Sequence, residues 1–189
     1  MTPVTRIIAG ASRGRRLAVP AGRTTRPTSD RVREALFSSV ESQLGSLAGL
    51  RVLDLYAGSG ALGLEALSRG ADHALLVESD ARAAQVIRTN VAALGLAGAR
   101  VVHASVQRTL TDPAEHPYGL VLADPPYTMA AYELTGTLSR LCGGWLVSEA
   151  LVVVERPSRA VPLLWPDCLT GSGHRRYGET MLWYGRPAG

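Results

Sequence analysis

The chain has 189 residues, is 46% hydrophobic and carries a formal net charge of +4. Its length suffices for one domain with a buried core. The first ten residues lack the apolar block of a signal peptide and no apolar run approaches about 18 residues, which argues against secretion and against a membrane span. We therefore expect a cytoplasmic protein, and a monomer.

The N-terminal region concentrates the positive charge. All 20 basic residues are arginine. Residues 1–33 contain eight arginines and one acid, a charge of +7, whereas residues 34–189 contain 12 arginines and 15 acids, a charge of −3. A basic segment on a slightly acidic body indicates an arm that binds a polyanion. The candidate RNA-binding residues are Arg6, Arg13, Arg15, Arg16, Arg23, Arg26 and Arg33.

The first elements form a small unit ahead of the main domain. "TRIIAG" and "RGRRLAVP" predict two short strands around a Gly-Ala-Ser turn, hence a hairpin, and "PAGRTTRPT" predicts a linker. "SDRVREALFSSVESQL" has apolar residues at helical spacing and Thr28 to Asp30 as capping candidates. We expect residues 1–27 to form a basic hairpin arm and residues 28–189 to form the catalytic domain.

From residue 51 the chain alternates between strand and helix patterns. Strands are predicted at "RVLDLY", "HALLVE", "ARVVHA", "GLVLAD" and "EALVVVE", with a last one at "GETMLWYG". Helices are expected up to Gly70 and from about Ser79 to Gly95. This order predicts an α/β fold with an open, mostly parallel sheet covered on both faces. Ligands of such sheets bind at the carboxyl ends of strands, near the reversal in strand order.

The loop after the first of these strands, "DLYAGSGALG", predicts a cofactor site. Gly58, Gly60 and Gly63 have G-x-G-x-x-G spacing, and Glu78 follows Gly58 by 20 residues, where a carboxylate can bind ribose hydroxyls. Asp54 precedes the loop. Unit charges about 4 Å apart interact by roughly 4 kcal/mol at an effective dielectric constant near 20, which disfavours a pyrophosphate beside Asp54. S-adenosylmethionine, a nucleoside with a cationic tail and no phosphate, fits this charge.

The predicted strand "LVLA" ends in Asp124, Pro125, Pro126 and Tyr127. The two prolines remove two backbone donors and fix two φ angles. Acceptors from Asp124 and the Pro125 carbonyl suit the N–H hydrogens of an exocyclic amine that gains charge during methyl transfer. Tyr127 offers a face for stacking a flipped-out base. These four residues are the candidate catalytic residues.

These motifs carry a resemblance to a known family. "DLYAGSGALGLEALSRGA" together with "LADPPY" resembles the class I methyltransferases that modify amino groups of nucleobases. "RIIAG", "RGRRLAVP" and "TRPTSDRVREALFSSV" resemble the narrower family of bacterial small-subunit methyltransferases that make N2-methylguanine in 16S rRNA. The resemblance runs from about Arg6 to Tyr184. It implies a seven-stranded Rossmann-like domain with an N-terminal hairpin, acting on a guanine within a 30S particle.

The same resemblance implies a set of residues that bind S-adenosylmethionine. Asp54, Gly58 and Gly60 would contact the methionine part, and Glu78 the ribose. Relatives often have an acid or an amide just after the third strand; Ser105 and Val106 stand there in this chain, so we expect a backbone contact with the adenine. The full set is Asp54, Tyr56, Ala57, Gly58, Ser59, Gly60, Glu78, Ser79, Ser105, Val106 and Asp124, with Thr28 and Arg31 bordering the pocket.

Other functions compete with this hypothesis. An adenine-N6 methyltransferase of DNA or RNA is the first, but the segment between Tyr127 and Glu149 has no room for a domain that reads bases in duplex grooves. A non-catalytic RNA-binding module does not explain the Asp-Pro-Pro-Tyr run, and Asp54 argues against a nucleotide-linked dehydrogenase. Four scattered histidines and Cys142 and Cys168 lack metal-ligand spacing, so we expect no metal and two reduced thiols.

Overall fold

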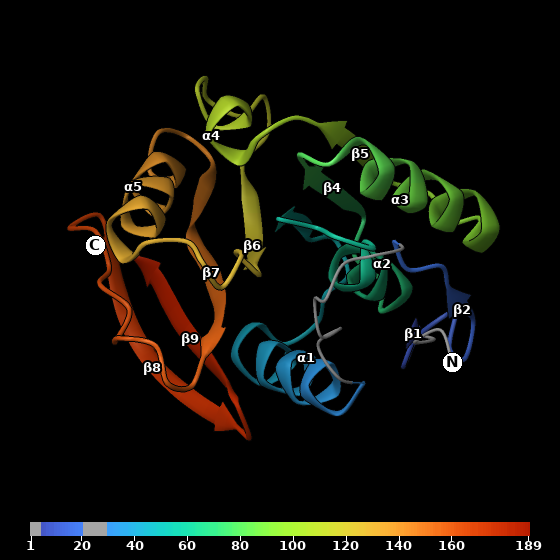
Figure 1. Ribbon diagram of the computed structural model, residues 1–189, viewed down its shortest axis with the longest axis horizontal. Coiled ribbons are helices and arrows are strands. Elements are labelled where there is room, and N and C mark those ends of the chain that lie inside the picture. Colours follow the sequence, from blue (N-terminus) through green and yellow to red (C-terminus); the bar gives the residue numbers. More distant parts are fainter. Residues whose placement is uncertain (1–4, 21–29) are drawn as a thin grey trace.

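The computed structural model describes residues 5–20 and 30–189 (Figure 1). Its centre is a seven-stranded sheet in the order β5-β4-β3-β6-β7-β9-β8, in which only β9 runs antiparallel to its neighbours. The strands are β3 (Arg51–Leu55), β4 (His73–Glu78), β5 (Ala99–His103), β6 (Tyr118–Ala123), β7 (Leu146–Pro157), β8 (Leu169–Tyr177) and β9 (Thr180–Pro187). The predicted open, mostly parallel sheet is confirmed.

Helices cover both faces of this sheet (Figure 1). One face packs against α1 (Asp30–Leu44), α2 (Ala61–Ser68) and α3 (Ala81–Leu94), and the other against α4 (Val106–Thr109) and α5 (Ala131–Leu141). Successive strand residues point to opposite faces, so Val52 of β3 packs toward the first group and Leu53 toward the second. With both faces covered, all six residues of β6 are buried, which explains its continuous apolar sequence.

The far edge of the sheet departs from the prediction. The last strand predicted from "GETMLWYG" is β9, but its partner β8 was not predicted. Residues Thr170 to Arg176 of β8 are exposed on both faces, and Gly171 and Gly173 interrupt the strand. Its sequence has no alternation of apolar and polar residues because neither face is buried. Pairing with β9, which depends on tertiary structure, makes this segment a strand.

The predicted N-terminal hairpin is present as β1 (Thr5–Arg6) and β2 (Arg16–Leu17), which pair antiparallel and lie beside α2 and α3 (Figure 1). The Glu65 carboxylate of α2 accepts hydrogen bonds from the amides of Ile8 and Ala9 at 2.8 and 3.0 Å. The hairpin also approaches α2 closely at Gly10, whose φ is 79°. A Cβ there would lie 1.7 Å from the Ser68 carbonyl oxygen, so only glycine fits.

Arg33 requires a correction. It was expected to contact RNA, but its side chain is 1% exposed and lies between α1, the hairpin and α2. Its guanidinium donates to Thr5 Oγ1 at 3.1 Å, to the carbonyl of Arg6 and to Asp30 Oδ1 at 3.0 Å, and its Nε lies 3.7 Å from Glu65 Oε2. A buried arginine needs such partners. Arg33 therefore attaches the hairpin to the domain and is not available to RNA.

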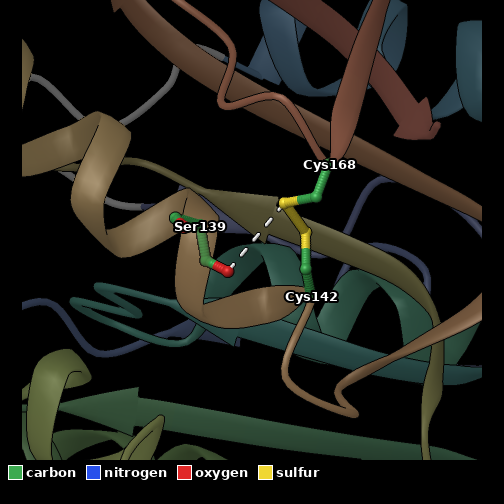
Figure 2. The surroundings of a disulfide bond; sticks show 3 residues. All are labelled: Ser139, Cys142 and Cys168. Atoms are coloured by element: carbon green, nitrogen blue, oxygen red, sulfur yellow. Dashed lines mark hydrogen bonds between the residues drawn. A yellow bond between two sulfur atoms is a disulfide. The ribbon is translucent and has the colours of Figure 1, made fainter.

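The two cysteines also require a correction. Cys142, at the end of α5, and Cys168, just before β8, form a disulfide across 26 residues, where reduced thiols were expected. Figure 2 shows the bond, with Cys168 Sγ 4.0 Å from the Ser139 carbonyl oxygen. The prediction failed because the spacing of two cysteines along a chain does not reveal whether the fold brings them together. The bond ties α5 to the edge strand β8.

Within residues 5–20 and 30–189, no helix is long and apolar enough to cross a bilayer.

Candidate active site

The two loops that carry the predicted site residues follow neighbouring strands. β3 and β6 are adjacent and parallel, with Leu55 opposite Ala123, and the strand order reverses between them. The amide of Asp124 donates to the carbonyl of Leu55 at 3.3 Å. The glycine loop after β3 and the Asp-Pro-Pro-Tyr loop after β6 therefore start side by side at one edge of the sheet. This reversal is where open α/β sheets bind ligands.

The glycine loop has a tight and specific backbone. Tyr56, Gly58 and Gly60 have φ values of 63°, 60° and 81°, and Gly60 is the N-terminal cap of α2. A Cβ on Gly60 would lie 3.1 Å from both Ile87 Cγ2 and Leu76 Cδ2. The loop is thus packed closely on its inner side, and the glycines let its backbone take this course. Its outer part, at Gly58 and Ser59, is partly exposed.

Glu78, at the end of β4, is fixed against this loop. The side chain is 2% exposed, and its carboxylate accepts from the Gly58 amide and from the Asp80 amide, both at 2.8 Å. A carboxylate has about four lone-pair positions and can accept from several donors at once. Two hydroxyls on neighbouring carbons of a ribose are donors of this kind.

Asp54 lies deeper than the sequence suggested. It is 1% exposed, and its Oδ2 accepts from the Gly63 amide in α2 at 2.8 Å. The pKa of Asp54 is raised to about 7 by burial and, less strongly, by the nearby Glu78, against the lowering effect of the Gly63 hydrogen bond. Asp54 thus holds the start of α2 beneath the glycine loop, and it carries a negative charge there once it ionises, at or above about pH 7.

Tyr56 connects the two loops on the α5 side. Its hydroxyl lies 3.5 Å from Thr137 Oγ1 of α5 and 3.7 Å from the sulfur of Met129, which follows the Asp-Pro-Pro-Tyr run. Burial of the ring raises the pKa of the Tyr56 hydroxyl. The neighbouring Ala57 is buried and donates from its amide to the Val77 carbonyl at 3.0 Å, which ties the loop to β4.

The Asp-Pro-Pro-Tyr loop combines a buried base with an exposed tip. Pro125 is buried and Asp124 is partly exposed, whereas Pro126 and Tyr127 are exposed, Tyr127 by 55%. The Pro126 carbonyl accepts from the Met129 amide at 2.9 Å, closing a turn. The buried Arg156 of β7 places its guanidinium 3.4 and 3.5 Å from the Met129 carbonyl. The tyrosine ring is therefore presented to solvent by a supported turn.

The remaining predicted residues lie around this edge or outside the described residues. Ser79 is exposed just after Glu78. Ser105 caps α4 by accepting from the Arg108 amide at 3.2 Å, while Val106 is 3% exposed and packs in the core. Arg31 is exposed in the first turn of α1. Thr28, Arg23 and Arg26, like the linker expected up to Thr28, lie outside the described residues.

Of the arginines assigned to RNA, Arg6, Arg13, Arg15 and Arg16 have exposed side chains on the docked hairpin. Arg6 pairs with Asp30 at 3.1 Å, and Arg15 donates to the Ala93 carbonyl of α3. Within the described part of the chain, no group of three or more His, Cys, Asp or Glu residues is placed to hold a metal ion.

Sequence reasoning missed several residues that support the site. Asn90 of α3 donates to the Ser59 carbonyl in the glycine loop at 2.9 Å, and Arg156 supports the other loop. One signal was present for Asn90, a polar residue on the face of α3 that carries Val86, Ile87 and Leu94. No such signal marked Arg156, because its role depends on the pairing of β6 with β7.

Comparisons with known proteins agree with this geometry. Residues 5–186 match the family model described as "Conserved hypothetical protein 95". Ribosomal RNA small subunit methyltransferase D of Escherichia coli K12 is 43% identical over 150 residues, which cover 79% of this chain and 73% of that protein. The protein of the same name from Haemophilus influenzae is 37% identical over 166 residues, covering 86% and 83% of the two chains.

Among solved structures, the Escherichia coli protein yhhF superposes with a TM-score of 0.82. It is 37% identical in sequence, and the match covers 99% of this chain and 100% of that one.

Proposed function

Because the chain belongs to the ribosomal RNA small subunit methyltransferase D family, we propose that it transfers a methyl group from S-adenosylmethionine to the exocyclic N2 amine of a guanine in 16S rRNA. The observation that carries this proposal is the adjacency of the two loops, with Leu55 opposite Ala123 in register. A donor on the glycine loop and a base on the Asp-Pro-Pro-Tyr loop would then meet at one edge of the sheet.

The residues around the glycine loop fit the proposed donor. Two carboxylates, Asp54 and Glu78, lie beneath and beside the loop, and both are almost fully buried. Negative charge at this position opposes a pyrophosphate and favours a ligand with a sulfonium and an ammonium. The Glu78 carboxylate would accept from the ribose hydroxyls. The Ser105 side chain caps α4, so backbone groups there would contact the adenine.

When bound, S-adenosylmethionine supplies an electrophilic methyl group. Asp124 would accept hydrogen bonds from the amine of the base, holding it in line and stabilising the positive charge that develops on nitrogen. The Pro125 carbonyl offers a second acceptor, and the exposed ring of Tyr127 offers a stacking face, worth about 1–3 kcal/mol per base. The proton released from nitrogen goes to solvent. The cysteines take no part, because Cys142 and Cys168 are joined in a disulfide and neither offers a free thiol.

Guanine suits the Asp124 carboxylate better than adenine does. The Watson–Crick edge of guanine presents N1–H and N2–H2, two neighbouring donors that one carboxylate accepts together, whereas adenine presents a donor beside an acceptor. Between Asp124 and β7 the chain forms only α5 and its connections, so a domain for reading duplex DNA is absent from this described segment. Both points favour guanine in RNA over adenine in DNA.

The proposed substrate also defines the partner and the place of action. The exposed arginines of the hairpin, Arg6, Arg13, Arg15 and Arg16, would contact phosphates of 16S rRNA in a 30S particle. Such a particle lies in the cytoplasm, so we propose that the enzyme acts there. A monomer suffices for the proposed site, because both loops come from the same chain.

Methylation of defined substrates tests this proposal. The protein is incubated with labelled S-adenosylmethionine and 30S particles that lack the modification, free 16S rRNA or DNA, and the methylated nucleoside is identified. We expect N2-methylguanine in rRNA. Label recovered as N6-methyladenine in DNA would contradict it.

Asp124→Ala tests the role of the carboxylate within the same assay. Removing a positioned group that stabilises transition-state charge lowers turnover by about 10²–10³-fold. Because Asp124 also belongs to the expected donor-binding set, donor affinity measured by calorimetry should fall as well, but far less than turnover. Asp167→Ala removes an exposed carboxylate on the connection before β8 and serves as the control. Full turnover by Asp124→Ala would mean that the carboxylate has no catalytic role.

A further inference from the structure

Asn90 is a buried polar residue on the otherwise apolar face of α3. The residue is 2% exposed, and its neighbours on that face include Ile87 and Leu94, which belong to the core. Burying an amide without partners costs free energy, so each of its polar groups needs a hydrogen bond. The partners that it finds come from two segments far apart in the sequence.

The Asn90 side chain makes three hydrogen bonds. Its Oδ1 accepts from the Ala18 amide at 2.8 Å, and its Nδ2 donates to the Ala18 carbonyl at 3.0 Å and to the Ser59 carbonyl at 2.9 Å. Both amide hydrogens are thereby used, and the orientation is defined, because a flipped amide would point its oxygen at two carbonyls.

The two partners belong to the two functional segments of the chain. Ala18 directly follows β2 of the basic hairpin, and Ser59 lies between Gly58 and Gly60 in the glycine loop. Arg15 of the same hairpin donates to the Ala93 carbonyl one turn further along α3. The side of the glycine loop away from Glu78 is thus joined to the hairpin through one side chain.

We propose that Asn90 is a positioning residue that couples the N-terminal hairpin to the glycine loop, so that rRNA and S-adenosylmethionine bind cooperatively. This inference rests on the proposed function. RNA on the hairpin restrains Ala18, and through Asn90 it restrains the Ser59 carbonyl and the loop around it. The free-energy cost of ordering the loop on donor binding is then smaller. By linkage, the donor strengthens RNA binding by the same factor.

The test measures this coupling directly. The dissociation constant of S-adenosylhomocysteine, the demethylated donor, is determined by calorimetry with and without saturating 16S rRNA, and the ratio is the coupling factor. For the wild-type protein we expect a factor of about 5 or more, the lower end of typical couplings. Asn90→Asp keeps the acceptor for the Ala18 amide but loses both donors, and we expect its factor to fall to about 1.

Ser68→Ala is the matched control. Ser68 holds the hairpin to α2 by accepting from the Ser12 amide at 2.9 Å and donating to the Ala9 carbonyl at 2.6 Å, so the variant loosens the hairpin. Neither partner lies in the glycine loop. It should bind rRNA more weakly than the wild type and keep the coupling factor at saturating rRNA. If Asn90 only stabilised the fold, Asn90→Asp and Ser68→Ala would not differ in their coupling factors.

Ala18→Pro repeats the test from the hairpin, in case Asn90→Asp does not fold. Ala18 has an exposed side chain, and proline removes the amide hydrogen that Asn90 Oδ1 accepts. We expect a reduced coupling factor here too. A coupling factor of 1 for the wild-type protein overturns the inference. So does a variant, Asn90→Asp or Ala18→Pro, whose coupling factor equals that of the wild type. Wild-type protein that binds no donor or methylates no rRNA refutes the proposed function instead, so the two failures are distinct.

Discussion

Asp54 and Glu78 are two buried carboxylates at one loop that are stabilised to different degrees. Glu78 accepts two backbone hydrogen bonds, from Gly58 and Asp80, whereas Asp54 accepts one, from Gly63, and the pKa of Asp54 is raised to about 7 by burial. Asp54 therefore costs the free protein stability near neutral pH. Once ionised, Asp54 would favour a cationic ligand such as the proposed methyl donor.

The raised pKa predicts a pH-dependent stability. Below about pH 4, Asp54 is protonated in both the folded and the unfolded protein. Between about pH 4 and about pH 7 the unfolded chain releases this proton while the folded protein keeps it, so the free energy of unfolding falls, by about 1.4 kcal/mol per unit of pKa difference. Above about pH 7 there is no further change from this group.

Asp54→Asn should remove this fall, since asparagine does not titrate and its oxygen can still accept from the Gly63 amide. Urea unfolding from about pH 4 to about pH 8 checks it. We expect the stability of the variant relative to wild type to increase across this range and its affinity for S-adenosylmethionine to decrease. Asp167→Asn, at an exposed position, is the control. A stability difference that does not vary with pH would show that Asp54 is ionised as usual.

At the scale of elements, the hairpin is held by α2 and α1 through a buried ion-pair group. Glu65 is fully buried and joins the Ile8 and Ala9 amides to Arg69 Nε at 2.9 Å, with Arg33 close by. The carboxylate accepts from three donors in two segments, and its charge lies 3.7 Å from Arg33 Nε. The hairpin is therefore docked on the domain, and its exposed arginines are presented from this docked position.

Replacing Glu65 by glutamine should release the hairpin. The variant keeps the side-chain size but removes the buried anion shared by Arg33 and Arg69, which keep only the partly exposed carboxylates of Asp30 and Glu41. Breaking a buried pair costs about 3–5 kcal/mol. We expect a lower free energy of unfolding in urea and faster hydrogen exchange at the Ile8 and Ala9 amides. Glu34→Gln, on the exposed face of α1, should change neither. Unchanged exchange at those two amides would contradict the role of Glu65.

The disulfide acts on a different part of the sheet. Cys142 and Cys168 join α5 to the start of β8. This start lies at the end of the strands away from the two loops, because β8 begins beside Pro187 and ends beside Thr180. Cys168→Ser should lower the free energy of unfolding by up to about 3.5 kcal/mol, the loop-closure value for 26 residues. Turnover should be unaffected. With reductant present, wild type and variant should unfold alike; a difference that persists would mean that the thiol packing matters and the bond does not.

For the whole molecule, the charge is divided between the arm and the body. Residues 1–33 carry +7 and residues 34–189 carry −3, and the docked hairpin presents Arg6, Arg13, Arg15 and Arg16 on one part of the surface. This division orients a polyanion toward the hairpin and away from the acidic body. Association with rRNA should accordingly weaken with salt.

Arg13→Gln/Arg16→Gln tests the arm. Both side chains are exposed, so we expect unchanged stability, weaker rRNA binding and a salt dependence of log K that is shallower by about one unit per arginine. Arg100→Gln/Arg140→Gln, which changes two exposed arginines outside the hairpin, is the matched control. Equal salt slopes for the two double variants would remove the hairpin from the RNA interface.

The sequence by itself predicted most of the elements and the fold class, and it gave the candidate positions for the proposed chemistry. Strand and helix periodicity, the glycines after β3 and the Asp-Pro-Pro-Tyr run are local patterns, and a parallel sheet necessarily brings the carboxyl ends of its strands to one edge. Tertiary structure alone decided the pairing of β8, the disulfide, the burial of Arg33 and the three hydrogen bonds of Asn90. These depend on contacts between residues tens of positions apart, which packing selects and no local pattern encodes.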